Sequence, residues 1–490
     1  MKPMKLSTLR KTMLLLTGFS AALVLYYGFT AKHKWTQRNN LSSDIFVPYV
    51  ASRLLKGVKE TIVTYRRPEQ SNITKNLSDS ISMKETHTHP KSKKDIKYYT
   101  QVEDMEIFIY SAITGNSTIN STWDNVVLTG WEHTRYTFIN FTCCLWYQKH
   151  GLMSVSGIQK HGGIQLKRAN LVAKQFVCSN PSRKWNDILL GITVTPITHS
   201  CSNDTNTYVE PIFAYRHRKA KLAICNKIVY GSVLPESILE WFEVQRLLGV
   251  DKVLTYANSD LNEEARQVLR YYEEIGMAEV LPFLIPMKDK YKRMVGQKST
   301  QAWNDEQVPV FDCLERLRGY KYMGILDLDE FLLPANEPSI PKLLARLFSK
   351  DPWAAGFSFK VQIFVTSWGM TNASAEFIVT QYTNRTKPMM DRVKNIFMPS
   401  RITPGGVSTH QYVADRSRNY KASKCPSSLG AISHYRTCRS EWQKGGERNK
   451  CGTFVRYRDT RMVNVLEPIK DRVLQLRKKL GITNPFGKVS

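Results

Sequence analysis

Two carboxylates at alternate positions, Asp327 and Asp329, follow an apolar segment at residues 322–326. Alternate side chains of an extended chain point the same way, so we expect both carboxylates to converge on one cation, with Leu328 turned toward the core. Hard cations such as Mg²⁺ and Mn²⁺ bind carboxylate oxygens and commonly bridge to phosphates. The pattern therefore predicts a metal site for a nucleoside diphosphate, although two solvated turn carboxylates are the alternative for an isolated Asp-x-Asp.

The segments around this motif alternate between strand and helix patterns. We expect strands at residues 105–110, 220–225, 251–256, 279–285 and 322–326, and helices at 235–248, 260–276 and 309–318. The second helix is expected to begin with a capping box formed by Asp260 and Glu263. This alternation predicts an α/β fold with a largely parallel sheet, and ligands bind such sheets beyond the carboxyl ends of the strands.

Composition excludes several other classes of protein. The chain has 490 residues, of which 42% are hydrophobic and 11% aromatic, so a disordered, collagen-like or coiled-coil protein is excluded. The net charge is +28, and residues 385–490 hold 23 basic and seven acidic side chains. A basic chain often binds nucleic acid, but the features of the N-terminus make that function unexpected here.

An uncharged run at residues 12–31 is long enough for a helix that crosses a bilayer. Basic residues precede it, which favours a cytosolic tail at residues 1–11. The run ends in bulky residues, so we expect an uncleaved signal-anchor; a cleaved signal peptide is the alternative. Residues 32–102 are polar and basic and are predicted to form a stem, followed by a single large domain at 103–490.

Sequons and cysteines agree with a lumenal location. Nine Asn-x-Ser/Thr sequons begin at Asn40, Asn72, Asn76, Asn116, Asn120, Asn140, Asn203, Asn372 and Asn384. The nine cysteines include no C-x-x-C motif, so we expect disulfides rather than a zinc site. An odd number leaves one thiol unpaired or shared between subunits.

Around Asp327–Phe331, followed by Pro334, the sequence resembles glycosyltransferase family 92. Further segments of that family are matched, in order, at residues 221–225, 236–250, 307–316 and 434–436. The resemblance covers residues 103–460 and implies a GT-A fold, dependence on Mn²⁺ and inverting transfer of galactose from UDP-galactose. It also implies a single-pass type II Golgi membrane protein with a lumenal catalytic domain.

The basic C-terminal part supplies further candidates. A metal held by two aspartates often has a third protein ligand, for which His410 and His434 are candidates, and the resemblance favours His410. Arg436 could pair bidentately with a phosphate, beside His434. Lys394 and Arg401 could neutralise the diphosphate, although a solvated charged face is the alternative for both.

An inverting transfer also needs a carboxylate that removes the proton of the acceptor hydroxyl. Glu330, Asp391 and Asp415 are candidates, and Asp391 is preferred because Glu330 lies within the metal motif.

Three functions are consistent with the sequence. The first is a membrane-anchored, metal-dependent glycosyltransferase whose partners are a nucleotide sugar and a glycan such as an N-glycan. The second is a non-catalytic lumenal protein that binds glycans, and the third is a secreted protein that binds polyanions through residues 385–490. We prefer the first, because a protein without catalysis need not keep both Asp327 and Asp329.

Overall fold

The computed structural model describes residues 98–115, 125–166, 170–181, 187–215, 218–286, 306–438 and 455–482. The chain divides into two compact units, Met1–Asn72 and Ile73–Ser490, and every described residue belongs to the second. The predicted signal-anchor at 12–31 and nearly all of the predicted stem lie outside the described residues. Within the part that is described, no helix is long and apolar enough to span a membrane.

Residues 98–215 form a β-rich region with two sheets. The larger sheet has the order β1-β2-β3-β7-β6, with β9 beside β2, and the smaller has the order β5-β4-β8. Their strands are β1 (Thr100–Gln101), β2 (Ile107–Thr114), β3 (Asn125–His133), β4 (Phe141–Tyr147), β5 (Gly151–Val155), β6 (Gln159–Leu166), β7 (Leu171–Ser179), β8 (Leu189–Pro196) and β9 (Pro211–Phe213). A shared apolar core, which includes Ile109, Leu128, Leu145 and Phe176, lies between them.

Disulfide bonds join segments that are distant from one another in the sequence. Cys143 on β4 is bonded to Cys178 on β7, which joins the two sheets, and Cys144 is bonded to Cys201. A third bond joins Cys225 to Cys313, and Cys438 is also disulfide-bonded. The predicted disulfides are therefore confirmed, and among the described cysteines the free thiol is the buried Cys425.

Residues 218–482 form an α/β region that begins with four parallel strands. The strands β10 (Arg218–Val229), β11 (Lys252–Ala257), β12 (Ala278–Pro282) and β13 (Tyr320–Ile325) lie in the order β12-β11-β10-β13. The helices α4 (Pro235–Leu247), α5 (Glu263–Glu274) and α7 (Gln307–Arg316) connect them. The predicted strand–helix alternation is confirmed over this stretch.

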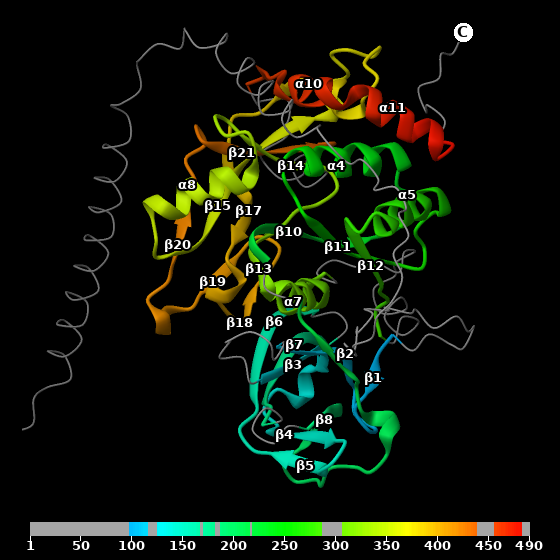
Figure 1. Cartoon of the computed structure of the whole chain (residues 1–490), viewed down its shortest axis with the longest axis vertical. Coiled ribbons are helices and arrows are strands. Elements are labelled where there is room, and N and C mark those ends of the chain that lie inside the picture. The colour runs from blue at the N-terminus through cyan, green and yellow to red at the C-terminus, as the bar shows by residue number, and fades with distance from the viewer. Residues whose placement is uncertain are drawn as a thin grey trace, which may run out of the picture. The chain divides into compact units, whose positions relative to one another are not determined.

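Both faces of the parallel sheet are covered by helices, as Figure 1 shows. Successive side chains of β10 point to opposite faces. Leu222 and Ile224 pack in the core formed with α4 and α5, whereas Ala223 and Cys225 pack in the core formed with α7. This double burial explains why these strands are almost continuously apolar.

The sheet continues beyond β13 with mixed strand directions. β17 (Met389–Phe397) runs antiparallel to both β13 and β15 (Ala354–Val365). β15 also pairs in parallel with β21 (Gly430–Arg436), which pairs antiparallel with β14 (Glu330–Pro334). The other elements are α8 (Ile340–Lys350), β16 (Asn384–Arg385), β18 (Ile402–Val407), β19 (Tyr412–Ala414), β20 (Lys421–Lys424), β22 (Tyr457–Arg458), α10 (Arg461–Leu466) and α11 (Lys470–Lys479).

The predicted capping box of α5 is wrong. The N-cap residue is Asn262, and its side chain makes no capping hydrogen bond. Instead, Asn262 Oδ1 accepts a hydrogen bond from the backbone N–H of Val233, and Asp260 Oδ1 accepts one from Gly231. These side chains fix the loop before α4 rather than the first turn of α5.

Helix α7 and strand β18 contact the β-rich region. The buried Asp312 of α7 accepts hydrogen bonds from Ser111 Oγ on β2 and from Tyr256 OH on β11. Gln175 Oε1 on β7 accepts a hydrogen bond from the backbone N–H of Gly405, at 2.6 Å. Gly405 has φ +64°, and a Cβ there would lie 2.5 Å from the Cβ of His161. Glycine therefore allows the two regions to approach closely at this point.

Candidate active site

Three charged side chains meet where β10 and β13 end. These parallel strands are neighbours, so Lys227 near the end of β10 lies beside Asp327, two residues after β13. Lys227 Nζ is 2.7 Å from Asp327 Oδ1, and Lys394 Nζ on β17 is 2.9 Å from Asp327 Oδ2. Burial raises the pKa of Asp327, but the two ammonium groups outweigh it and hold that pKa well below its usual value. Asp327 is therefore a carboxylate with both oxygens paired.

The second aspartate of the motif faces a histidine. The antiparallel register of β14 and β21 places His434 directly opposite Glu330, beside Asp329. His434 Nε2 is 3.2 Å from Asp329 Oδ2. The Asp329 side chain is 47% exposed and that of His434 is 8% exposed, so this pair forms the accessible edge of the cluster.

The buried Glu330 contacts His434 on the side of the imidazole ring that faces away from Asp329. Its Oε1 lies 3.5 Å from His434 Nδ1, and its Oε2 lies 2.8 Å from Lys394 Nζ. Oε2 also accepts a hydrogen bond from the backbone N–H of Asp327, at 2.9 Å. Burial raises the pKa of Glu330, and the charge of Asp327 adds to this while Lys394 and His434 oppose it. Since Glu330 occupies the Nδ1 side of the imidazole, Nε2 is the nitrogen turned toward Asp329.

This donor set fits a divalent cation. Asp329, Glu330 and His434 each offer a ligand atom, and these atoms lie within 4.8 Å of one another. Carboxylate oxygen with imidazole nitrogen suits divalent first-row metals, including Mn²⁺. A carboxylate on the far nitrogen of a ligating histidine is the usual supporting arrangement. Asp329 and His434 would therefore hold the ion, with Glu330 orienting the ring.

A family model described as glycosyltransferase family 92 matches residues 220–469, just over half of the chain. The chain belongs to glycosyltransferase family 92. The match contains the whole cluster described above and confirms the resemblance found in the sequence, whereas the β-rich region and α11 lie outside it.

The two solved structures described below share little sequence with this family 92 protein. No curated protein matches the chain. A crystal structure of apo UDP-glucose pyrophosphorylase is similar at 12% identity and a TM-score of 0.21, covering 53% of this chain and 98% of that one. The UDP-glucose complex of a UDP-glucose pyrophosphorylase gives 10% identity and a TM-score of 0.20, covering 53% and 99%.

Charged residues of the cluster affect the pKa values of two further predicted residues, His410 and Arg436. His410 Nδ1 is 3.1 Å from the carbonyl oxygen of Val393. Burial, together with the charges of Lys394 and Lys227, lowers the pKa of His410 to about 4, so its ring is neutral at pH 7. Arg436 lies two residues after His434 on β21, on the same side of the strand. Burial lowers its pKa, and the nearby charge of Asp329 opposes that effect.

Arg401 lies away from these residues. Its guanidinium donates hydrogen bonds to the carbonyls of Pro352 and Ala354 and lies over the ring of Tyr420. That is the amino end of β15, whereas Arg436 pairs with Val365 at the other end of the same strand. The structure therefore gives Arg401 a local role in supporting the chain before β15.

Asp391 is exposed on β17, three residues before Lys394. Its role as the general base stays a prediction. Asp415 caps a short 3₁₀ helix by accepting a hydrogen bond from the backbone N–H of Ser417.

The sequence did not indicate that Lys227 and Lys394 both pair with Asp327. The chain turns after Asp327, where the backbone N–H of Glu330 donates to the carbonyl of Asp327, so the two aspartates do not follow the alternation of a strand. Asp327 faces the lysines and Asp329 faces His434. In the sequence, Lys227 is marked only by its position just after an apolar strand pattern. In the structure, Lys394 is buried and is a counter-ion of Asp327 and Glu330.

Proposed function

We propose that this chain is a membrane-anchored, metal-dependent, inverting glycosyltransferase that transfers galactose from UDP-galactose to a glycan such as an N-glycan. The observation that carries the proposal is the Asp329–His434 pair with Glu330 behind it, at the carboxyl end of a parallel sheet. Family membership supports glycosyl transfer in general, and the donor, acceptor and metal belong to the proposal.

Each residue of the site has its own role in the proposed transfer. Mn²⁺, when bound, supplies positive charge to the diphosphate as the glycosidic bond breaks. Asp329 and His434 would hold the cation, and Glu330, which lies 3.5 Å from Nδ1 of His434, would orient the ring. The Arg436 guanidinium supplies further charge to the leaving group through its planar fork. Asp391 is the candidate that accepts the proton of the attacking hydroxyl.

The location is also part of the proposal. The uncharged run at 12–31 would anchor the chain in the Golgi membrane, with the described residues in the lumen. Of the four sequon asparagines that the structure describes, Asn140, Asn203 and Asn372 are exposed, as glycosylation requires, and Asn384 is half-buried. Disulfides are consistent with the same compartment.

The direct test uses the full chain in detergent with Mn²⁺ and a panel of UDP-sugars, and it measures release of UDP in the presence of N-glycan acceptors. We expect turnover with UDP-galactose, and Asp329→Asn should lower it more than about 100-fold, because a ligand of the cation is lost. Glu337→Gln is the matched control, since Glu337 pairs with Arg346 on the surface, outside the cluster. Turnover by Asp329→Asn at the wild-type rate would refute the metal assignment.

The same preparation tests the other two functions. Binding of glycan without turnover on any UDP-sugar would favour a non-catalytic glycan-binding protein. Binding of polyanions that weakens steeply with salt, again without turnover, would favour the basic residues 385–490 as the functional surface.

A further inference from the structure

Lys227 has a backbone conformation that calls for an explanation. Its φ is +38°, in the region that residues with a Cβ rarely adopt. It lies at a bulge where the pairing of β10 with β11 shifts between Cys225 and Ile228. Such strain persists only where the surroundings impose it, and it gathers at functional sites.

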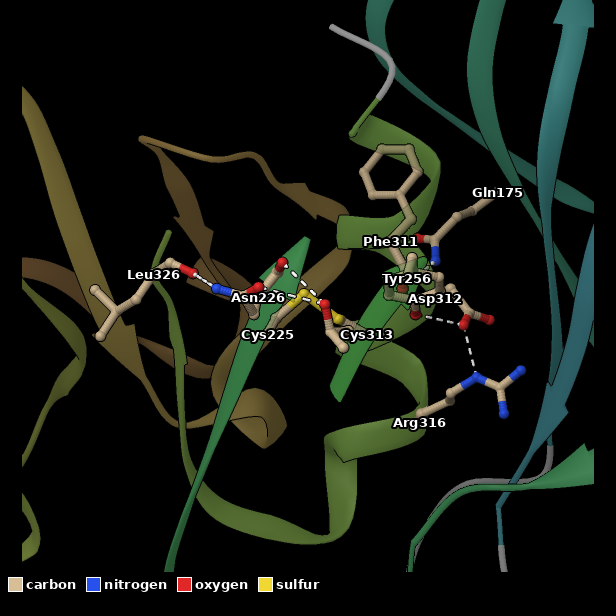
Figure 2. The surroundings of a disulfide bond; sticks show 10 residues. Gln175, Cys225, Asn226, Tyr256, Phe311, Asp312, Cys313, Arg316 and Leu326 are labelled. Carbon is tan, nitrogen blue, oxygen red and sulfur yellow. Dashed lines mark hydrogen bonds and ion pairs between the residues drawn. A yellow bond between two sulfur atoms is a disulfide. The ribbon is translucent and has the colours of Figure 1, made fainter. Parts of the chain in front are cut away.

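The two residues before Lys227 are fixed by covalent and hydrogen bonds, as Figure 2 shows. The disulfide between Cys225 and Cys313 joins β10 to α7. The buried Asn226 donates from Nδ2 to the carbonyl oxygen of Leu326 at 2.9 Å, and its Oδ1 lies 3.3 Å from Thr255 Oγ1. Leu326 immediately precedes Asp327, so the same bonds set the position of Lys227 relative to Asp327.

The two lysines on Asp327 are not equivalent. Lys394 is fully buried and is shared between Asp327 and Glu330, so its ammonium already has two carboxylates. Lys227 has one carboxylate in its ion pair, and its side chain is 14% exposed. Of the two lysines, Lys227 is the one whose side chain is partly exposed, so it is the one that we expect an incoming anion to reach.

We propose that Lys227 is a donor-binding residue, which pairs with Asp327 in the free protein and contacts the diphosphate of the nucleotide sugar when the donor binds. The inference rests on the proposed function, since it takes the cluster to be the donor site. In the free protein, the Lys227 charge also lowers the negative potential next to Asp329 and His434, and so weakens their attraction for a cation.

The two roles predict opposite effects of one substitution. In Lys227→Met, the cluster loses a positive charge, so Mn²⁺ without nucleotide should bind about threefold to tenfold more tightly. UDP at saturating Mn²⁺ should bind about tenfold more weakly, because a charge-assisted contact with phosphate is lost. Binding of both ligands to the full chain is measured by calorimetry, which does not depend on turnover.

Two further variants complete the experiment. Lys227→Arg keeps the charge and should restore UDP binding to within about threefold of wild type. Lys221→Met is the matched control, because Lys221 lies on the same strand and pairs with Asp251 on the surface. It should change neither affinity.

The outcomes separate the inference from the proposed function. Wild type that binds neither Mn²⁺ nor UDP refutes the proposed function. Wild type that binds both, with Lys227→Met unchanged, refutes the inference alone. Weaker binding of both ligands by Lys227→Met also overturns it, since that pattern means that Lys227 only holds Asp327 in place. If Lys227→Met does not fold, Lys227→Gln replaces it in the same two measurements, with the same opposite shifts expected.

Discussion

Arg436 shows how little a net charge says about the task of one side chain. Residues 385–490 are strongly basic, yet only some of these cations lie near Asp329. The guanidinium of Arg436 is partly buried there, and a planar fork binds phosphate oxygens in a way that an ammonium does not.

We therefore expect Arg436→Lys to lower kcat with UDP-galactose about tenfold or more, a cost of about 1.4 kcal/mol in the barrier. Arg416→Lys, in an exposed short 3₁₀ helix, is the control and should leave kcat unchanged. Steady-state kinetics measure kcat for both variants. If Arg436→Lys keeps the full kcat, the diphosphate does not bind at Arg436.

His410 gives the fold a measurable dependence on pH. Burial and the lysine charges lower its pKa in the folded protein to about 4, while the unfolded chain keeps the ordinary value of about 6.5. Below pH 6.5 the unfolded chain binds a proton that the folded protein does not. His410 therefore destabilises the fold progressively as pH falls from 6.5 toward 4.

The expected slope is at most about 1.4 kcal/mol of unfolding free energy per pH unit, the value for one proton. Urea unfolding of wild type and His410→Asn between pH 7.5 and 5.0 measures it. The variant should lose less stability than wild type over this range, and equal losses would mean that His410 titrates normally in the fold.

At the scale of elements, α11 is held on α4 by ion pairs with two buried glutamates. Arg477 lies 2.7 Å from Glu240, and Arg472 lies 2.7 Å from Glu243. Glu240 also accepts hydrogen bonds from the backbone N–H groups of Ile378 and Val379. Although α11 lies outside the family match, it covers a helix that packs against the parallel sheet.

Arg477→Met should lower the free energy of unfolding by about 3–5 kcal/mol, because it leaves a buried carboxylate without its ion pair. Burial already raises the pKa of Glu240 to about 7. A raised carboxyl pKa means that the folded state takes up a proton more readily than the unfolded chain, so the variant should regain stability as pH falls from 8 to 6. Lys478→Gln, an exposed neighbour on α11, should change stability by less than about 0.5 kcal/mol in the same urea titrations.

Helices and strands that show a local apolar pattern could be predicted from the sequence. Strands that form by pairing with distant segments of the chain could not. The helices and strands from β10 to β13 follow their apolar periodicity, which a sequence displays directly. The β-rich region offered only one clear strand in advance, because its short strands depend on partners elsewhere in the chain. His434 meets Asp329 through the pairing of β14 with β21, across 105 residues, and no local signal indicates that register.

At the scale of the molecule, the β-rich region and the α/β region are joined by polar contacts that are themselves buried. Asp312 on α7 accepts hydrogen bonds from Ser111, Tyr256 and Arg316, and its side chain is inaccessible to solvent. Polar networks of this kind are costly to leave incomplete.

Asp312→Ala should therefore cost about 3–5 kcal/mol of unfolding free energy, because it leaves Arg316 without its buried partner. Ser111→Ala should cost about 1 kcal/mol, the contribution of one hydrogen bond. Ser154→Ala, on the exposed side of β5, serves as the reference in the same chemical denaturation. A loss for Ser111→Ala no larger than for Ser154→Ala would show that the network does not join the two regions energetically.

The arrangement of the first two disulfides has a consequence for biosynthesis. Cys143 and Cys144 are adjacent on β4, so their side chains point to opposite faces of the strand, one toward Cys178 and the other toward Cys201. Exchanging the two partners would require the strand to be turned over. All four thiols also precede Cys225 in the sequence. If the chain is synthesised into an oxidising compartment, these four cysteines can therefore pair with one another before Cys225 emerges, whose partner Cys313 lies 88 residues further along the chain.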